Sequence, residues 1–127
     1  MKPPYEHKRS SFLVEVEQIP SYLIYSIDRP TFTYIGNTYE PLPIDMWLYD
    51  PISPSSTRLI FDEFINKSNN LIGNVTINIL GLVGEYVEKW ELTDVKILEI
   101  CFDKMTMEGV KPLGIKLKLS YKAELIF

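Results

Sequence analysis

The sequence is poor in the side chains that most enzymes and metal proteins use for chemistry. It has one cysteine, Cys101, and one histidine, His7, so it can form neither an internal disulfide nor a zinc site from soft ligands. A cysteine nucleophile also needs a base, and His7 lies far along the chain in a polar segment broken by prolines. We therefore expect no catalytic residue, no metal and no cofactor, and we interpret Cys101 as a small buried side chain.

Long apolar runs are also missing. No stretch reaches the roughly 18 apolar residues that a membrane-spanning helix needs. The first ten residues are polar and do not lead into the apolar run of a secretory signal. We expect a protein that is made and kept in a cytosol-like compartment, with no membrane partner.

The sequence has no excess of positive charge. Lysine and arginine number 13 against 17 aspartates and glutamates, which gives a net charge of −4. The outside of such a protein lacks the basic patch that supplies most of the affinity for a nucleic acid. The length of 127 residues and the apolar share of 46% instead fit one globular domain with a real core.

Alternation of apolar and polar residues is abundant, and this is the period of a β-strand with one wet face. From Ile115 to Phe127 every second residue is apolar. A strand of this length exceeds the five or six residues that are usual in globular sheets, so it spans a large sheet or extends to meet a partner. Other strands are predicted at residues 12–18, 22–27, 31–35, 44–49, 74–80, 86–92 and 95–100.

Glycines and small polar residues mark the turns between these strands. Gly36-Asn37 tolerates positive φ and predicts a tight turn, and residues 81–84 predict a hairpin between the strands at 74–80 and 86–92. Thr93-Asp94 is expected to interrupt the chain between the strands at residues 86–92 and 95–100. These turns favour antiparallel pairing.

One helix is predicted over residues 57–67. Leu59, Ile60 and Phe64 have the spacing of one apolar helix face, and a Ser or Thr in the loop at residues 50–57 can cap its first turn. The fold class is therefore mainly β (α+β), an antiparallel β-sandwich or barrel with one flanking α-helix. We assign residues 12–127 to a single β domain and residues 1–11 to a flexible N-terminal arm.

The strand at residues 44–49 carries large apolar groups on both faces. Trp47 and Tyr49 alternate with Ile44, Met46 and Leu48. Such a strand is buried on two sides within one subunit, or it is covered on one side by a second subunit. The sequence leaves both possibilities open.

Several segments resemble the tail-tube proteins of contractile-tailed bacteriophages and related injection machines. They are the strand that ends in the acidic-proline loop at Asp50-Pro51, the glycine turn that leads into Val87-Glu88-Lys89-Trp90-Glu91-Leu92, and the β-rich end from Gly114. The opening strand at residues 12–17 and the step at residues 29–32 are also similar to that family. The resemblance covers most of the chain and includes the tube-initiating proteins of baseplates.

The resemblance implies a structural protein of the virion tail and not an enzyme. Six copies would form a ring, and stacked rings would form a hollow tube through which DNA passes without specific binding. Sheath, baseplate and tail-terminator proteins would be neighbours, and assembly would take place in the host cytoplasm. Subunit-interface candidates are Trp47, Tyr49, Asp50, Pro51, Ile52, Leu125 and Phe127.

The expected charge of the tube lumen restricts where the lysines of the final strand can face. A lumen of net negative character would let DNA slide, because it offers no basic lining for the phosphates. Lys116, Lys118 and Lys122 must then lie beside acids such as Glu15, Glu17 or Glu88, or they must face away from the lumen.

The alternative from another class is a monomeric small-ligand-binding β-barrel, because up-and-down barrels also contain many alternating strands. Assembly separates the two, since a ligand barrel stays monomeric around an apolar pocket. An enzyme is disfavoured. Carboxylate pairs such as Glu15 with Glu17 fit a solvated strand face better than the converging acids of a glycosidase.

Overall fold

The structure is a computed structural model that describes residues 11–51, 53, 55–107 and 113–127. The N-terminal arm expected at residues 1–11 lies outside the described residues except for Ser11. The backbone carbonyl of Ser11 accepts a hydrogen bond from the Leu80 N–H at 2.8 Å, so the chain enters the fold beside the end of a strand.

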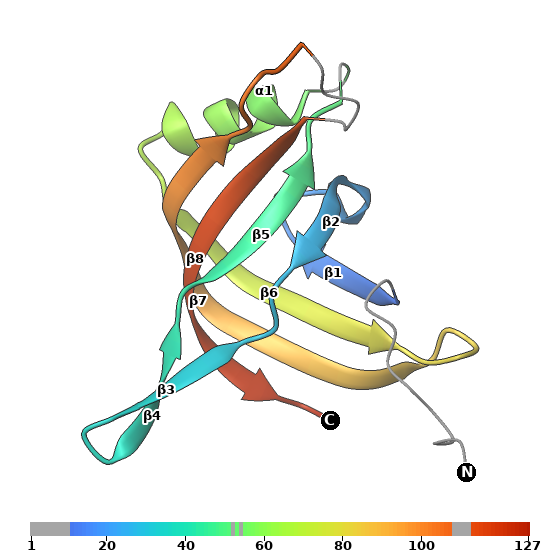
Figure 1. Cartoon of the computed structure of the whole chain (residues 1–127), viewed down its shortest axis with the longest axis vertical. Helices are drawn as coiled ribbons and strands as arrows, with labels where there is room; N and C mark the ends of the chain where they lie inside the picture. Colours follow the sequence, from blue (N-terminus) through green and yellow to red (C-terminus); the bar gives the residue numbers. More distant parts are fainter. Residues whose placement is uncertain (1–10, 52, 54, 108–112) are drawn as a thin grey trace.

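Six antiparallel strands form one sheet in the spatial order β1-β6-β7-β8-β5-β2. Their bounds are β1 Phe12–Val16, β6 Leu71–Leu80, β7 Tyr86–Phe102, β8 Gly114–Leu125, β5 Ile44–Tyr49 and β2 Ile24–Ile27. The sheet coils so far that its two edge strands, β1 and β2, lie on the same side of the molecule (Figure 1). A short turn, η1 (Ser21–Leu23), comes between them in the chain. The result is a nearly closed barrel-like sheet, which confirms the predicted fold class.

A separate two-stranded hairpin projects from the barrel. It consists of β3 (Thr31–Ile35) and β4 (Thr38–Leu42) and forms the lobe at the lower left of Figure 1. Gly36 and Asn37 join the strands with φ values of 56° and 73°. Positive φ at both positions is the geometry of a two-residue type I′ turn, so the predicted tight turn is confirmed.

The inward sheet face and the helix form one apolar core. Met46, Leu48, Leu117 and Leu119 are 0% exposed, and side chains from β1, β6 and β7 surround them. Each such side chain contributes about 1.5–3 kcal/mol relative to an exposed position. These residues occupy the inward positions of the alternation, which is why the period-two pattern identified the core strands.

The predicted helix is present with shifted ends and an unexpected geometry. It begins as α1 (Ser56–Ile60) and continues as a π-helical turn, η2 (Phe61–Ile65), with N–H groups of Asn66 and Asn69 bonded five residues back. The Ser55 hydroxyl caps the first turn by accepting from the Arg58 N–H at 3.2 Å. Ile60 and Phe64 are buried at one end of the barrel, as expected of the apolar stripe. Within the described ranges no helix has the length and hydropathy for crossing a membrane.

β7 is one continuous strand where the sequence predicted two. The interruption expected at Thr93-Asp94 is a bulge, at which the pairing register shifts and Asp94 takes a φ of 52°. The prediction that Cys101 is buried was wrong, because Cys101 is exposed. It lies opposite Lys116 on the solvent-facing side of the sheet. The bulges in β7 shift the alternation of inward and outward residues, and Cys101 therefore faces outward.

The last strand is longer than the core that it covers. Ile115 is 0% exposed and Tyr121 is 6% exposed, whereas Leu125 is 53% exposed, although all three belong to the same alternating series. The C-terminal end of β8 therefore presents apolar side chains that the described part of this subunit leaves exposed.

Gly114 provides a test of the packing at the start of β8. A Cβ at this position would lie 2.7 Å from the Tyr25 hydroxyl oxygen and 3.3 Å from the Leu48 carbonyl oxygen. We expect Gly114→Ala to lower the free energy of unfolding by about 1–3 kcal/mol, because the Tyr25 ring must move. Urea denaturation of the wild type and the variant measures the loss.

The double variant Gly114→Ala with Tyr25→Phe is the control. It removes the hydroxyl oxygen that the new methyl group meets, so it should recover part of the lost stability relative to Tyr25→Phe alone. Equal destabilisation in both backgrounds would show that the contact with Tyr25 is not the cause.

Candidate assembly surface

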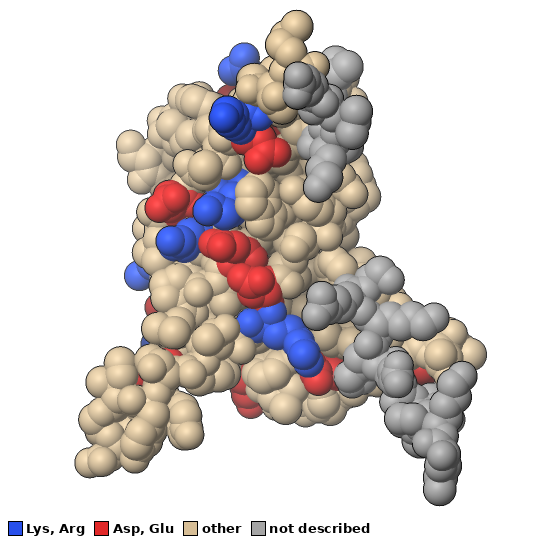
Figure 2. Space-filling view, in the orientation of Figure 1, with Lys and Arg blue, Asp and Glu red and all other residues tan. Residues whose placement is uncertain are grey.

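The β3–β4 hairpin has one aromatic face. Phe32, Tyr34, Tyr39 and Pro41 share this side, because Phe32 pairs with Pro41 and Tyr34 with Tyr39. We call these four residues the hairpin face. The three aromatic side chains are 41%, 61% and 68% exposed in chain order, and the Tyr34 and Tyr39 ring centroids are 5.0 Å apart. In Figure 2 the lobe is almost free of charged residues, and Glu40 is its only charged side chain.

The base of the hairpin is held against the barrel by side-chain hydrogen bonds. The Tyr121 hydroxyl accepts from the Thr31 N–H at 3.1 Å and donates to the Thr31 carbonyl at 3.3 Å. Burial raises the pKa of Tyr121, the bond with Thr31 opposes this shift, and Asp28 adds to it. The phenol therefore stays protonated at neutral pH and can donate. Arg29 adds a partly exposed ion pair with Glu88 at 3.1 Å.

A second aromatic group lies at the far end of β5. The Tyr25 ring is 4.4 Å from the Tyr49 ring and 6.3 Å from the Trp47 ring, and the Lys116 ammonium lies 6.0 Å from the centre of the Trp47 ring. Burial raises the pKa of Tyr25, with smaller contributions from Asp103 and Tyr49. Beside this group is an open hollow of about 310 Å³. We call it the tyrosine hollow; it is lined by Tyr22, Leu23, Tyr49, Asp50 and Pro51.

The structure brings some of the predicted interface residues together and separates others. Tyr49, Asp50 and Pro51 line the tyrosine hollow, and Trp47 lies beside it. Leu125 and Phe127 are 53% and 54% exposed at the opposite end of β8, about 36 Å along a strand whose first residue pairs with Tyr49. The C-terminus and the hairpin lie at the same end of the molecule (Figure 1). Ile52 lies outside the described residues.

Asp50 also has a role within the subunit. Its carboxylate accepts from the Thr57 N–H at 3.1 Å, the Thr57 hydroxyl at 2.6 Å and the Ser55 hydroxyl at 3.3 Å. These bonds tie the end of β5 to the first turn of α1. The sequence pattern alone did not indicate this role, because the bonded residues lie across a loop whose path was not predicted.

The hairpin face was missed as a candidate surface. The signal was present in the sequence, since residues 31–42 contain large apolar side chains around a tight turn. Alternation alone cannot show whether the apolar face of a strand meets the core or the solvent, and here it meets the solvent.

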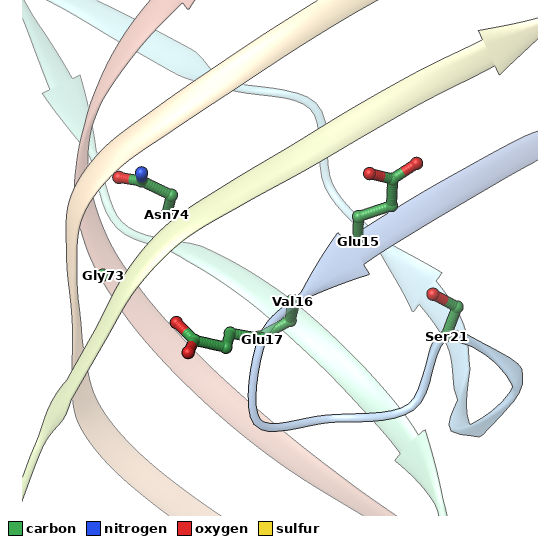
Figure 3. A pocket seen from close by; sticks show the side chains of 6 residues that line it. All are labelled: Glu15, Val16, Glu17, Ser21, Gly73 and Asn74. Atoms are coloured by element: carbon green, nitrogen blue, oxygen red, sulfur yellow. The ribbon is translucent and has the colours of Figure 1, made fainter.

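A hollow of about 470 Å³ beside β1 holds two carboxylates, Glu15 and Glu17, together with Asn74 and Ser21. The two carboxyl groups point in different directions (Figure 3). Among the described residues no group of three His, Cys, Asp or Glu could hold a metal ion. This geometry fits the solvated acidic strand face that the sequence predicted.

The lysines of β8 have different neighbours from those expected. Lys118 lies opposite Asp45 on one side and Glu99 on the other, and Lys116 lies beside Trp47. Of the acids named from the sequence, Glu88 binds Arg29. Glu15 and Glu17 belong to the region of β1, which is separated from β8 by β6 and β7. Figure 2 shows both signs of charge interspersed along the middle of this face.

Substitution of Asp50 tests its structural role. We expect Asp50→Ala to lower the free energy of unfolding by about 1–2 kcal/mol, because α1 loses bonds to its first-turn groups. Chemical denaturation provides the measurement. Asp62→Ala is a control, since among the described residues Asp62 has only the exposed ion pair with Arg58 at 3.9 Å, and it should change stability little. Unchanged stability of Asp50→Ala would rule out the anchoring role.

No protein-family model matches the sequence, and no curated protein matches it. Solved structures do match the fold. A chain of the anti-feeding prophage baseplate, six-fold symmetrised, is similar with a TM-score of 0.64 and 16% identity over 99% of this chain and 97% of that one. A chain of the sheath–tube complex of PVC, an extracellular contractile injection system, is similar with a TM-score of 0.65 and 12% identity, over 97% of this chain and 91% of that chain.

Hcp1 from Salmonella typhimurium is similar with a TM-score of 0.58 and 13% identity, over 87% of this chain and 80% of that chain. The resemblance inferred from the sequence is thus confirmed in the fold. The chain has the Hcp-like fold of the tube proteins of contractile injection systems.

Proposed function

We propose that this protein is a structural subunit of the tube of a contractile tail, in which rings of six copies stack into a hollow conduit. The observation that carries the proposal is that a fold shared with tube subunits leaves large apolar side chains exposed in separate places. One set is the hairpin face with Leu125 and Phe127, since the C-terminus and the hairpin lie at the same end (Figure 1), and the other set is Tyr22 and Tyr49 at the tyrosine hollow.

The edges of the sheet provide a way to close a ring. Each of β1 and β2 is paired on one side only within the described residues. Unpaired edges invite pairing with another chain, and closure of strands into a barrel removes them. An edge strand of a neighbouring subunit that pairs with β1 or β2 would cover that edge in the ring.

The solvent-facing side of the sheet, which carries the lysines of β8, suits the wall of a conduit. The lysines of β8 are interspersed with acids such as Asp45 and Glu99, so this face offers no continuous basic lining. DNA would pass such a wall without specific binding, because a wall without a continuous basic lining neutralises few phosphates and therefore releases few of their counterions. We assign this face to the lumen.

The core argues against the alternative of a monomeric ligand barrel. Met46, Leu48, Leu117 and Leu119 fill the inward side of the sheet and are 0% exposed. These side chains take the space that a small ligand would occupy inside a barrel. The filled core favours the structural role over the ligand barrel.

The proposed location is the tail of a phage-like virion or injection particle, assembled in the cytoplasm of the host. Sheath, baseplate and tail-terminator proteins are the proposed neighbours. Both the body of the tube and its baseplate-proximal first ring fit these surfaces.

Negative-stain electron microscopy of the purified protein, with its solution mass measured over a range of concentrations, tests the function. We expect six-fold rings or hollow tubes that increase with concentration, because the uncovered surfaces then find partners. Native mass spectrometry on the same samples is the control for a bound small molecule. A monomer at every concentration with a ligand of constant mass would favour the ligand barrel instead.

A further inference from the structure

We propose that the N-terminal segment, residues 1–10, turns back over β1 of its own subunit, and that the Arg9 guanidinium binds between Glu15 and Asn78. The segment lies outside the described residues, and the proposal assigns it a binding site on the described part of the chain. The contact lies within one subunit. It therefore goes beyond the proposed tube function and does not depend on it.

Three carboxylates lie in one row across four strands of the sheet. Glu15 on β1 pairs with Thr76 on β6. Thr76 pairs in turn with Glu91 on β7, and Glu91 pairs with Glu124 on β8. The row is on the solvent-facing side, because Val14, the residue before Glu15, faces the core. We call Glu15, Glu91 and Glu124 the acidic row. The ion pairs among the described residues involve none of its members, so its charge has no partner there.

Asn78 indicates where a cation would bind along the acidic row. It is 1% exposed and lies on the same side of β6 as Thr76. Its Nδ2 donates to the Leu13 carbonyl and to the Glu15 Oε1, both at 3.4 Å. Its Oδ1 is buried and has no hydrogen-bond partner among the described residues. A buried amide oxygen without a donor is unfavourable, so this atom points to a donor that belongs next to Glu15.

A guanidinium fits this pair of groups. The bound group must carry positive charge for Glu15 and give an N–H to the Asn78 Oδ1. Arginine has five N–H donors in a planar fork and can serve a carboxylate and a second acceptor at once. Lys89 already lies opposite Asn78 on β7 and leaves the Oδ1 without a donor. A metal ion fits less well, because the described residues bring no three His, Cys, Asp or Glu side chains together as ligands.

The N-terminal segment has the complementary charge. Residues 1–10 contain three basic side chains, Lys2, Lys8 and Arg9, and one acid, Glu6. A basic segment tethered beside an uncompensated acidic row is attracted to it, and the attraction is strongest at low ionic strength. The occupant of the site is therefore a part of this same chain.

The reach of the segment fits the position of the site. The carbonyl of Ser11 accepts from the Leu80 N–H beside the start of β1, and Leu13 pairs with Asn78 two positions further along. Arg9 is two residues before Ser11, which is at most about 7 Å of chain, and Asn78 lies about 7 Å from Leu80 along β6. A reverse turn directly before β1 therefore brings the guanidinium to the acidic row.

Limited digestion with trypsin tests the contact in the full chain. Trypsin cleaves after Arg9 only when the guanidinium is free to enter the specificity pocket of the protease. We expect Glu15→Gln to speed cleavage of the Arg9–Ser10 bond about fivefold, because the ion pair is lost. Mass spectrometry of the products at early times gives the rate. Gln keeps an oxygen that can accept from Asn78, so the thermal transition should stay that of the wild type.

Glu17→Gln is the matched control. It makes the same change of charge on the next outward residue along the chain, and the two carboxyl groups point in different directions (Figure 3). Its cleavage rate should equal that of the wild type. About 0.5 M sodium chloride should speed cleavage of the wild type and of Glu17→Gln but not of Glu15→Gln, because salt screens only a pair that exists. Equal rates for the wild type and Glu15→Gln would overturn the proposal.

A double-mutant cycle measures the same contact without a protease. The urea midpoint of the double variant Arg9→Ala with Glu15→Gln should equal that of either single variant, because each change alone already breaks the pair. Additive shifts of the midpoint would reject the contact.

The dependence on protein concentration shows whose segment occupies the site. Protection of the Arg9–Ser10 bond should be the same at every concentration, since the contact is within one subunit. Protection that increases with concentration would assign the segment to Glu15 of a second copy and overturn the proposal. Neither result bears on whether the protein forms rings, so the tube function is tested separately.

Discussion

The pairing of β7 with β8 is the interaction on which the rest of the structure depends. It runs from Trp90 opposite Leu125 to Phe102 opposite Ile115, so it extends along most of the length of both strands. All other strands of the sheet are added on either side of this pair, β6 and β1 beyond β7, and β5 and β2 beyond β8. The inward side chains of β8 form the centre of the core. Strands this long would expose apolar surface in a small domain unless the sheet coils on itself, and the coil brings both edges to one side.

The length of β8 also explains why apolar side chains are exposed at its C-terminal end. The core covers β8 as far as Tyr121, and the alternation continues beyond it to Leu125. Tyr121 stands at this boundary, where its ring closes the core and its hydroxyl holds the base of the β3–β4 hairpin. The hairpin extends the apolar surface beyond the barrel. One side chain thus links the stability of the barrel to the orientation of the hairpin.

Much of this fold can be predicted from the sequence, because period two assigns each strand residue to a face. The core residues Leu117 and Leu119, the turn at Gly36-Asn37 and the capped helix follow from local patterns. The exposure of Cys101 cannot be predicted in this way, because bulges near Asp94 and Leu98 shift the register of β7. Whether a bulge forms depends on the pairing with the neighbouring strand, which local sequence does not show. The π-helical turn at Phe61–Ile65 also depends on packing. The interface surfaces are least predictable, since alternation does not tell a core face from an uncovered one.

The exposed aromatic residues pose a solubility problem that the structure itself addresses. A tube subunit must remain dispersed until it assembles, yet its contacts must be apolar enough to hold rings together. The hairpin face and the tyrosine hollow are formed by different elements, β3 and β4 in the first case and η1 with the end of β5 in the second. The wet face between them carries both signs of charge, with Lys118 set between Asp45 and Glu99, and the net charge of −4 adds repulsion between free monomers. In the proposed tube, association would thereby be directed to these apolar surfaces, where repeated contacts of one kind would produce an ordered stack and not an irregular aggregate.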